Sequence, residues 1–333
     1  MSAPDAETDG PAVVAIVGPT AVGKSAVALE VAGALGGEIL SADSVKVYRG
    51  LDIGSAKPSA SDRRRAPHHL LDVAEPGEQF SVALFVALAR AALRSMAERG
   101  KACVVDGGSG LYMRALLDGS ALTGVPEAPQ IRQRLEEEAE SLGTPALHAR
   151  LACEDPVVAA RIHRNDRKRI VRALEVLEAS GVPMSELHAR DAATRRPIQA
   201  ARIGLTAPRD WLHRRIDERA DAMVASGLVE EVRGLLRSGL SRRAPGLTSL
   251  GYREIGGFLA GEQSLGEAVA EMKRNTRRFA KRQMTWFRAD PAIEWFDVTQ
   301  TPRSAIVAAA VGYVSGRRVS FDGALELWRR PSS

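Results

Sequence analysis

The chain is poor in the residues that crosslink small secreted proteins or anchor proteins in membranes. Only two of its 333 residues are cysteines, and Cys103 and Cys153 form neither a CxxC pair nor a zinc-ligand pattern. We therefore expect reduced structural thiols in a cytoplasmic protein rather than disulfides. No uninterrupted apolar run approaches the roughly 18 residues that indicate a membrane-spanning helix, so we predict no membrane segment.

The two ends of the chain are predicted to be tails. The first ten residues, MSAPDAETDG, lack the apolar core of a signal peptide, and their polar composition predicts disorder over residues 1–11. We expect a second tail over residues 316–333. The chain is 45% hydrophobic and 26% charged, which is ordinary for a globular protein with room for two domains or one domain with an insertion.

The most informative stretch is GPTAVGKS, residues 18–25, which fits the phosphate-binding pattern G-x-x-x-x-G-K-[ST]. An apolar β-branched run at 12–17 precedes it and a helical pattern follows, so the phosphate would lie at a helix N-terminus. Backbone N–H groups and Lys24 would hold phosphate oxygens, and the Ser25 hydroxyl would ligate Mg²⁺. The predicted loop residues are Gly18, Pro19, Thr20, Ala21, Val22, Gly23, Lys24 and Ser25.

A carboxylate follows the next predicted strand, EIL at 38–40. Asp43 lies in SADSVKVYRG, and in a parallel sheet it would stand beside the phosphate loop. Its carboxylate would hold Mg²⁺ or take a proton from an attacking nucleophile. The alternative is that its side chain only caps the turn.

A second carboxylate ends the predicted strand at 102–106. Asp106 resembles a Walker B residue, which would hold Mg²⁺ and favour nucleotide hydrolysis. The alternative is that only the following GGSGLY turn matters, with Ser109 as a hydroxyl or a helix cap. Paired histidines in PHHLLD (67–72) have no third ligand nearby, which favours a structural role over a metal site.

Two basic stretches account for much of the net charge of +5. RIHRNDRKRIVR (161–172) carries six Arg or Lys and KRNTRRFAKRQMTWFR (273–288) carries seven, a density that suits an extended anionic polymer. In the second stretch, helical spacing would align basic residues on one face, with aromatics that anchor the helix or stack on a base. The alternative is a solvated basic face.

The order of predicted elements indicates an α/β fold of the P-loop NTPase type, with a parallel sheet flanked by helices. Strand character disappears at about 123–200, which we interpret as a helical insertion domain. The catalytic core would then comprise residues 12–122 and about 201–315.

Seven ordered blocks give the chain a more specific resemblance. The sequence resembles the tRNA dimethylallyltransferases, the bacterial tRNA isopentenyltransferases, over roughly residues 12–290. The blocks that carry the resemblance are GPTAVGKS, SADSVKVYRGLDIGSAKP, PHHLLD, GGSGLY, RIHRNDRKRIVRALEV, LGYREI and NTRRFAKRQMTWFR.

The resemblance implies a prenyl transfer in which no nucleotide is hydrolysed. The loop would hold the diphosphate of dimethylallyl diphosphate with Mg²⁺, and N6 of adenosine 37, 3′ of the tRNA anticodon, would attack C1 and release pyrophosphate. It assigns Asp43 as general base, Ser109 to a position usually held by Thr, and Arg219 to the diphosphate, with Arg215 as a weaker choice. We expect the protein to act as a monomer in the cytoplasm.

The resemblance also implies the tRNA contacts. The helical insertion would hold the anticodon stem-loop, and the target base would turn out of its stack. The assigned residues are Asp43, Ser44, Val45, Lys46, Arg132, Lys168, Arg169, Ile170, Val171, Arg172, Thr248, Gly251, Tyr252, Arg253, Arg277, Arg278, Lys281 and Arg282.

Two residues depart from the family pattern. Lys46 stands where many relatives carry Gln, and Asp106 stands where an apolar residue is usual, which we interpret as local variation. Three alternatives remain: an enzyme that prenylates free AMP, ADP or ATP, a phosphoryl-transferring NTPase or kinase that depends on Asp106, and a non-catalytic RNA-binding protein.

Overall fold

The computed structural model describes residues 12–119, 128–314 and 316. The chain divides into two compact units, one that ends at Leu117 and resumes at Ile198, and one that comprises Asp118–Pro197. Sequence patterns placed the same division near residues 123 and 200, a few residues later. The tails expected over 1–11 and 316–333 lie outside the described residues, apart from Gly316.

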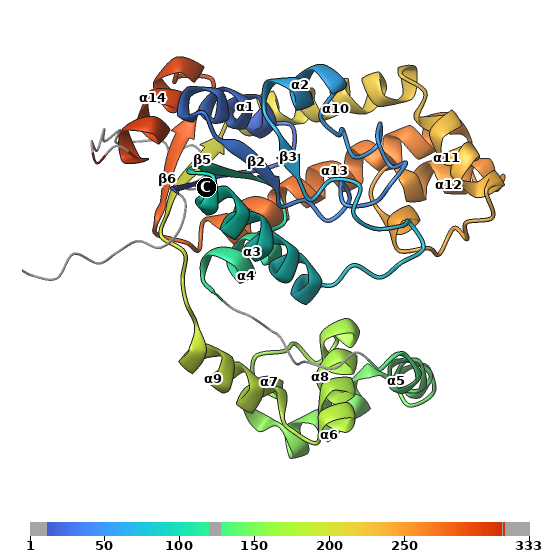
Figure 1. The fold of residues 1–333 in the computed structure, drawn as a ribbon. Helices are drawn as coiled ribbons and strands as arrows, with labels where there is room; N and C mark the ends of the chain where they lie inside the picture. Colours follow the sequence, from blue (N-terminus) through green and yellow to red (C-terminus); the bar gives the residue numbers. More distant parts are fainter. Residues whose placement is uncertain (1–11, 120–127, 315, 317–333) are drawn as a thin grey trace, which may run out of the picture. The chain divides into compact units, whose positions relative to one another are not determined.

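The first unit is built on a six-stranded sheet in the order β3-β2-β4-β1-β5-β6, and the register makes every neighbouring pair parallel (Figure 1). The predicted parallel sheet is confirmed. β1, β2 and β4 are buried along their whole lengths, and β1 and β4 are rich in valine and isoleucine, as expected for strands covered on both faces. The strands are β1 Val13–Val17, β2 Glu38–Ser41, β3 His68–His69, β4 Cys103–Asp106, β5 Ala200–Thr206 and β6 Ile293–Asp297.

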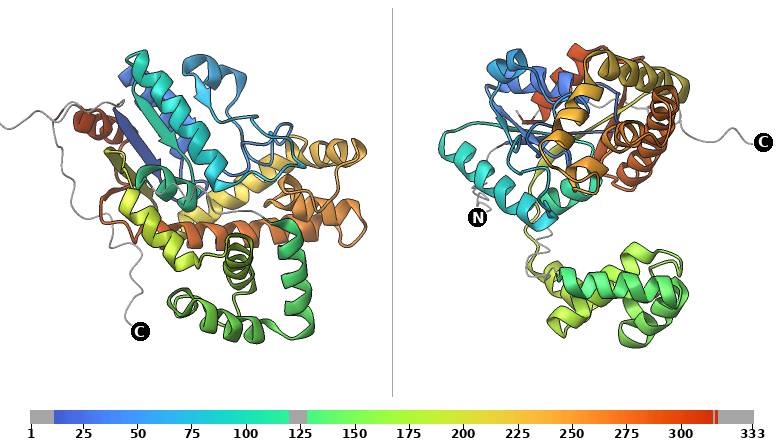
Figure 2. Two further views of the ribbon diagram at one scale, coloured as in Figure 1. Left: turned by 60° about the horizontal axis from the view of Figure 1, so that its bottom comes forward. Right: turned by 90° about the vertical axis from the view of Figure 1, so that its right-hand side faces the viewer.

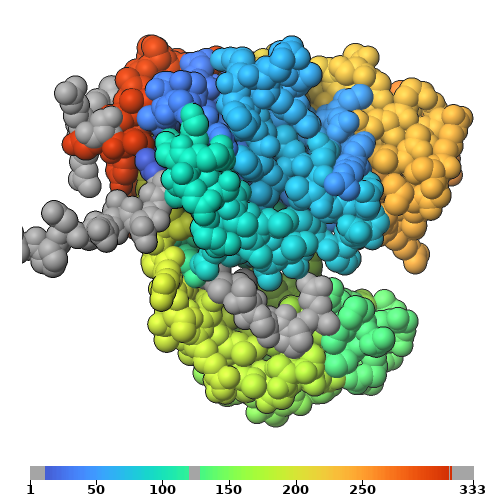
Figure 3. Space-filling model, in the orientation of Figure 1, coloured from blue at the N-terminus to red at the C-terminus, as the bar shows by residue number. Residues whose placement is uncertain are grey.

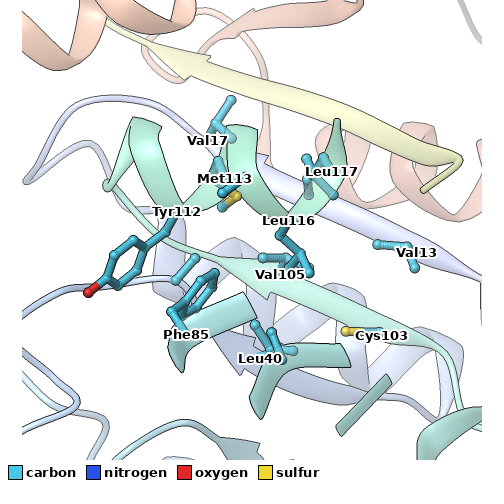
Figure 4. Packing of buried hydrophobic residues seen from close by; sticks show 14 of the residues in the cluster. Val13, Val17, Leu40, Phe85, Cys103, Val105, Tyr112, Met113, Leu116 and Leu117 are labelled. Carbon is cyan, nitrogen blue, oxygen red and sulfur yellow. The ribbon is translucent and has the colours of Figure 1, made fainter. Parts of the chain in front are cut away.

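Helices cover both faces of this sheet because alternate residues of β1 point to opposite sides. Val13 and Val17 pack with Phe85 of α3 and Met113 of α4 in one apolar cluster (Figure 4). Val14 and Ile16 belong to a second cluster, to which the helices α1, α10 and α14 contribute. The helices named here are α1 Lys24–Leu35, α3 Val82–Glu98, α4 Gly110–Leu117, α10 Arg209–Ala225 and α14 Arg303–Val314.

A third apolar cluster joins the loop after β2 to the later helices. Val47 and Leu51 pack with Tyr252, Ala268 and Met272. The long helix α13 lies alongside α10 (Figure 2). On the face shown in Figure 3, the segments between β2 and α3 adjoin α3 in one continuous surface. The remaining elements are α2 Ala60–Arg65, α11 Leu228–Arg237, the 3₁₀ turn η1 Gly246–Thr248, α12 Tyr252–Leu259 and α13 Leu265–Phe287.

The second unit is helical in every element that the structure describes. Its core joins Leu135, Leu147, Leu151, Ile170 and Leu174 from three of the helices. Its helices are α5 Pro129–Ser141, α6 Thr144–Glu154, α7 Pro156–Ala159, α8 Arg167–Ser180 and α9 Met184–Thr194. In the described parts of both units, no helix is long and apolar enough to cross a membrane.

Candidate active site at the carboxyl edge of the sheet

The phosphate loop joins β1 to α1, as the sequence predicts. Gly18 has φ +138°, and a Cβ there would lie 2.4 Å from the carbonyl oxygen of Leu205, so only glycine fits at this close approach. The loop ends at Gly23, which adopts a left-handed conformation and precedes the first turn of α1. Lys24 curls back and donates to the carbonyl of Pro19 at 2.8 Å.

Five charged groups surround this loop. Burial lowers the pKa of Lys24 from 10.5 to about 8, because its ammonium loses water. The carboxylates of Asp106 and Asp43 raise that pKa, whereas the positive charges of Arg219 and Lys46 lower it. Three cations and two carboxylates therefore act on one another at the end of β1, and the balance of charge suits an anionic ligand.

Asp43 follows β2 and adopts the turn-capping role that the sequence offered as one alternative, while its role as proton acceptor stays a prediction. Its Oδ1 accepts hydrogen bonds from the backbone N–H groups of Val45 at 2.8 Å and Lys46 at 3.3 Å, which caps the turn. Only Oδ1 takes part in these two bonds, so Oδ2 retains its capacity to accept a proton. The turn thus holds the carboxylate in place without consuming its second oxygen.

Asp106 lies at the end of β4, level with Ile16 of β1 and Ser41 of β2. Its Oδ2 accepts a hydrogen bond from the Ser25 hydroxyl at 2.7 Å. Lys46 Nζ lies 3.9 Å from the same oxygen, and both side chains are about nine-tenths buried, at 10% and 8% exposure. The side chain of Lys46 thus turns inward to Asp106, and its predicted tRNA contact stays a prediction.

The GGSGLY turn packs against the end of β2. A Cβ on Gly107 would lie 2.1 Å from the carbonyl oxygen of Ala42, so the two backbones meet there. Ser109 Oγ accepts from the backbone N–H of Tyr112 at 3.4 Å, at the start of α4. In this structure the Ser109 hydroxyl therefore acts as a helix cap, which is one of its two predicted roles.

Gln283 of α13 joins the phosphate loop to this turn and was missed from the sequence. Its Oε1 accepts from the backbone N–H of Thr20 at 2.8 Å, and its Nε2 donates to the carbonyl of Gly108 at 2.8 Å. The sequence does carry a signal that Gln283 is buried. It belongs to the buried stripe of α13, which recurs at helical spacing and includes Ala280, Met284 and Phe287. A lone amide in an apolar stripe indicates a specific buried contact.

Arg219 approaches the loop from α10. Its Nη1 lies 3.4 Å from Thr20 Oγ1, and burial lowers the pKa of its guanidinium. Arg215 instead is exposed and pairs with Glu218 at 3.0 Å. The structure thus brings the first-choice arginine, and not its neighbour, to the phosphate loop.

An open cleft of about 640 Å³ adjoins Arg219. Met223 and Ile53 supply apolar walls, and Lys57 lines another side. The Lys57 ammonium is held by the carbonyl of Tyr48 and by two carboxylates, so it shapes the cleft rather than presenting a free charge. The cleft therefore places a partly apolar space beside the Arg219 side chain.

The basic residues of α13 are mostly exposed, as expected for an RNA-binding face. Arg278, Lys281 and Arg282 have exposed side chains. Arg277 differs, because its guanidinium Nε donates to Asp217 of α10 at 3.1 Å. Of the aromatics in this stretch, Phe287 is buried in the core and so anchors the helix.

The stretch Thr248–Arg253 divides between surface and core. Thr248 and Arg253 are exposed, whereas Gly251 and Tyr252 are buried. The Tyr252 hydroxyl donates to Glu231 Oε1 at 2.7 Å, and burial raises its pKa. The side chain of Tyr252 is therefore buried in this structure, and its predicted tRNA contact stays a prediction.

The helical unit shows the same division in Lys168–Arg172. Lys168 and Arg169 are exposed, but Ile170 and Val171 have 0% and 2% exposure and belong to the core. Helix α8 therefore presents its charged residues outward and its apolar residues to the core, and the predicted tRNA contacts of Ile170 and Val171 stay predictions.

Arg172 and Arg132 converge on one fully buried carboxylate, Glu175. Arg132 Nε donates to Glu175 Oε2 at 3.0 Å, and Arg172 Nη1 lies 2.9 Å from the same oxygen. These two contacts fix the orientation of both arginine side chains, which were predicted to bind RNA.

The histidines of PHHLLD have protein partners. His69 Nε2 lies 2.7 Å from Glu38 Oε2, and His68 Nδ1 lies 2.8 Å from the carbonyl oxygen of Ala66. Among the residues that the structure describes, no group of three His, Cys, Asp or Glu side chains could hold a metal. Both contacts agree with a structural role for the pair.

Comparison with known proteins gives consistent matches over most of the chain. The model of the family described as IPP transferase matches residues 46–290. The tRNA dimethylallyltransferase of Syntrophobacter fumaroxidans is 49% identical over 289 residues, which are 87% of this chain and 84% of the relative. The tRNA dimethylallyltransferase 1 of Trichlorobacter lovleyi is 48% identical and covers 90% of this chain and 98% of its own.

Solved structures agree. The crystal structure of the full-length tRNA isopentenylpyrophosphate transferase from Bacillus halodurans has a TM-score of 0.67 at 39% identity and covers 92% of this chain and 96% of its own. A eukaryotic dimethylallyltransferase acting on tRNA has a TM-score of 0.77 at 23% identity, covering 94% and 81%, and is similar in fold.

Proposed function

The chain belongs to the IPP transferase family, and from this premise we propose that it transfers a dimethylallyl group from dimethylallyl diphosphate to N6 of adenosine 37 in tRNA, with release of pyrophosphate. The observation that carries the proposal is the meeting of the phosphate loop, Arg219 and Asp43 at one end of the sheet. Such a site combines a cradle for an anionic leaving group with a proton acceptor.

The loop and its cations stabilise the leaving group. As the bond from C1 to the diphosphate oxygen breaks, negative charge grows on that oxygen. Backbone N–H groups at the start of α1, the Lys24 ammonium and the Arg219 guanidinium would offset this charge. Thr20 and Gly108, tied by Gln283, keep the loop in this shape.

Asp43 supplies the proton acceptor. The N6 amine of adenine is a weak nucleophile, and it must lose one proton as the N6–C1 bond forms. Oδ2 of Asp43 accepts this proton, while Oδ1 remains bonded to the N–H groups of the turn. Ser109 acts here by capping α4 and thereby shaping the turn.

Mg²⁺ fits the chemistry of the donors at the loop. Mg²⁺ prefers oxygen ligands and commonly uses one or two protein groups together with substrate phosphates. The Ser25 hydroxyl would hold it, and when bound it neutralises charge on the diphosphate.

The exposed basic residues account for tRNA binding. Arg278, Lys281 and Arg282 on α13 and Arg253 near α12 would contact phosphates, as would Lys168 of the helical unit. The target adenosine must leave its stack to reach Asp43. We expect the protein to act as a monomer in the cytoplasm.

A transfer assay tests the proposal. Purified protein, Mg²⁺ and radiolabelled dimethylallyl diphosphate are mixed with unmodified tRNA and, in parallel, with AMP and ATP. We expect label in tRNA alone, at one anticodon-loop adenosine. Label in free nucleotide would indicate a nucleotide prenyltransferase, and ATP hydrolysis without any transfer would overturn the assignment of the loop.

A further inference from the structure

We propose that Asp106 is a protein ligand, together with Ser25, of the divalent cation that accompanies the diphosphate. The proposal rests on the proposed function, because it concerns how the same loop holds its charged substrate. It departs from the family pattern, in which an apolar residue is usual at this position, and it assigns a role that is specific to this chain.

The first support is the state of the Asp106 carboxylate. The residue is 6% exposed, and within the described part of the chain its Oδ1 has no hydrogen-bond partner. A buried charged oxygen without a partner loses its hydration and gains nothing in return. A divalent cation beside it would remove that deficit.

The second support is the direction of the Ser25 hydroxyl. A hydroxyl has one proton and two lone pairs. Because Ser25 donates its proton to Asp106 Oδ2 at 2.7 Å, the lone pairs of its oxygen remain for a cation. The hydrogen bond places the carboxylate and the hydroxyl together at the start of α1, where the phosphate loop would hold a diphosphate.

The third support is the ion pair between Asp106 and Lys46. Lys46 Nζ lies 3.9 Å from Asp106 Oδ2, and both side chains are buried. A buried carboxylate beside an anion-binding loop is unfavourable unless a positive charge offsets it. Lys46 supplies that charge in the metal-free protein.

The fourth support is the small number of protein ligands that Mg²⁺ requires. A cage of three acidic or imidazole groups is absent from the described residues. Mg²⁺ does not need one, since it is usually bound by one or two carboxylates, waters and substrate phosphates. One carboxylate and one hydroxyl beside a diphosphate meet this requirement.

The test measures pyrophosphate binding by calorimetry, once with Mn²⁺ and once with chelator and no divalent ion. Neither tRNA nor an allylic substrate is present, so a failure of prenyl transfer would not affect the result. The quantity of interest is the factor by which Mn²⁺ tightens pyrophosphate binding. We compare the wild-type chain with Asp106→Asn, which keeps the shape and an acceptor for Ser25 but removes the charge.

A ligand role predicts opposite changes in the two conditions. Without metal, Asp106→Asn should bind pyrophosphate equally or more tightly, because a negative charge beside the anion is gone. With Mn²⁺, the tightening factor should fall by at least about 10- to 100-fold, because the loss of an outer partner of a metal ligand already has this effect and Asp106 is proposed as a ligand itself. An undiminished tightening factor would overturn the proposal. A parallel loss of affinity in both conditions would also overturn it, since that result indicates a purely structural carboxylate.

Two further variants test whether the result is specific to the carboxylate of Asp106. Asp106→Val introduces the apolar type of the relatives and should lose the Mn²⁺ effect while retaining a cooperative thermal transition. Asp297→Asn is the matched control. Asp297 is 4% exposed, ends β6 and, within the described part of the chain, has an Oδ2 without a partner, but β5 separates its strand from β1. It should keep the full Mn²⁺ effect; an equal loss there would show that any buried carboxylate produces the result.

Discussion

The side-chain oxygen of Gln283 accepts a hydrogen bond from the backbone N–H of Thr20 at 2.8 Å, between positions separated by 263 residues. The amide nitrogen of the same side chain donates to Gly108 at 2.8 Å. Helix α13 therefore fixes both the phosphate loop and the turn after β4. This bridge couples the shape of the phosphate site to a helix that also carries the predicted RNA-binding face.

Replacing Gln283 with Leu should loosen the phosphate loop. The change leaves the Thr20 N–H and the Gly108 carbonyl without their partner, and such losses cost about 1–3 kcal/mol each. We expect the KM for dimethylallyl diphosphate to rise about tenfold or more, while the affinity for tRNA changes little. Thr285→Ala, an exposed change on the same helix, is the control. Wild-type kinetics in the Gln283→Leu enzyme would show that this bridge does not shape the phosphate site.

Replacing Asp43 with Ala should lower turnover by about 10²- to 10⁴-fold, the usual contribution of a general base. Asp43→Asn is the sharper variant, because it keeps an acceptor for the Val45 and Lys46 N–H groups and removes only the proton acceptor. Both variants should bind tRNA nearly as well as the wild type. Single-turnover rates decide the matter: normal rates in Asp43→Asn would show that this carboxylate only caps the turn.

The strand–loop–helix order and the helical unit were predictable because each element has a strong local pattern. The run AVVAIV is apolar at every position, and the helix after the phosphate loop ends at a glycine. The local sequence alone therefore defines this strand and this helix. β3 has only two residues, both histidines, and its strand character comes from pairing with β2. β6 has no simple alternating pattern, because Trp295 and Phe296 are buried in different clusters on the two faces, beside the half-buried Glu294.

The sequence pattern locates some parts of the candidate site more sharply than others. Charged and glycine residues of a phosphate loop have fixed spacing, so Lys24 and Ser25 could be assigned. Contiguous blocks of RNA contacts could not be resolved residue by residue, because a helix buries one side of any such block. Ile170 and Tyr252 are buried for this reason. The burial of Gln283 had a local signal in the apolar stripe of α13, but its partner Thr20 lies 263 positions away and no local pattern encodes that pairing.

Pyrophosphate binding in the absence of metal should weaken as pH rises through about 8. Burial lowers the pKa of Lys24 to about 8, so the free protein holds the ammonium below that pH and loses it above. Binding an anion favours the charged form, and complex formation above pH 8 therefore requires uptake of a proton. Lys24→Arg keeps its charge throughout and reports the titration of pyrophosphate itself. Parallel pH profiles for the two proteins would contradict the assigned role of Lys24.

Charge reversal at Arg278 should weaken tRNA binding and flatten its dependence on salt. Arg278 is exposed on α13, and each phosphate contact contributes about one unit to the slope of log affinity against log salt concentration. Arg278→Glu should lose about one unit of that slope, with prenyl transfer at saturating tRNA much less affected. The matched control is Arg94→Glu on α3, which changes the net charge equally at an exposed position outside the predicted RNA contacts. If both variants shift the slope alike, the effect comes from overall charge and the α13 face is not the binding surface.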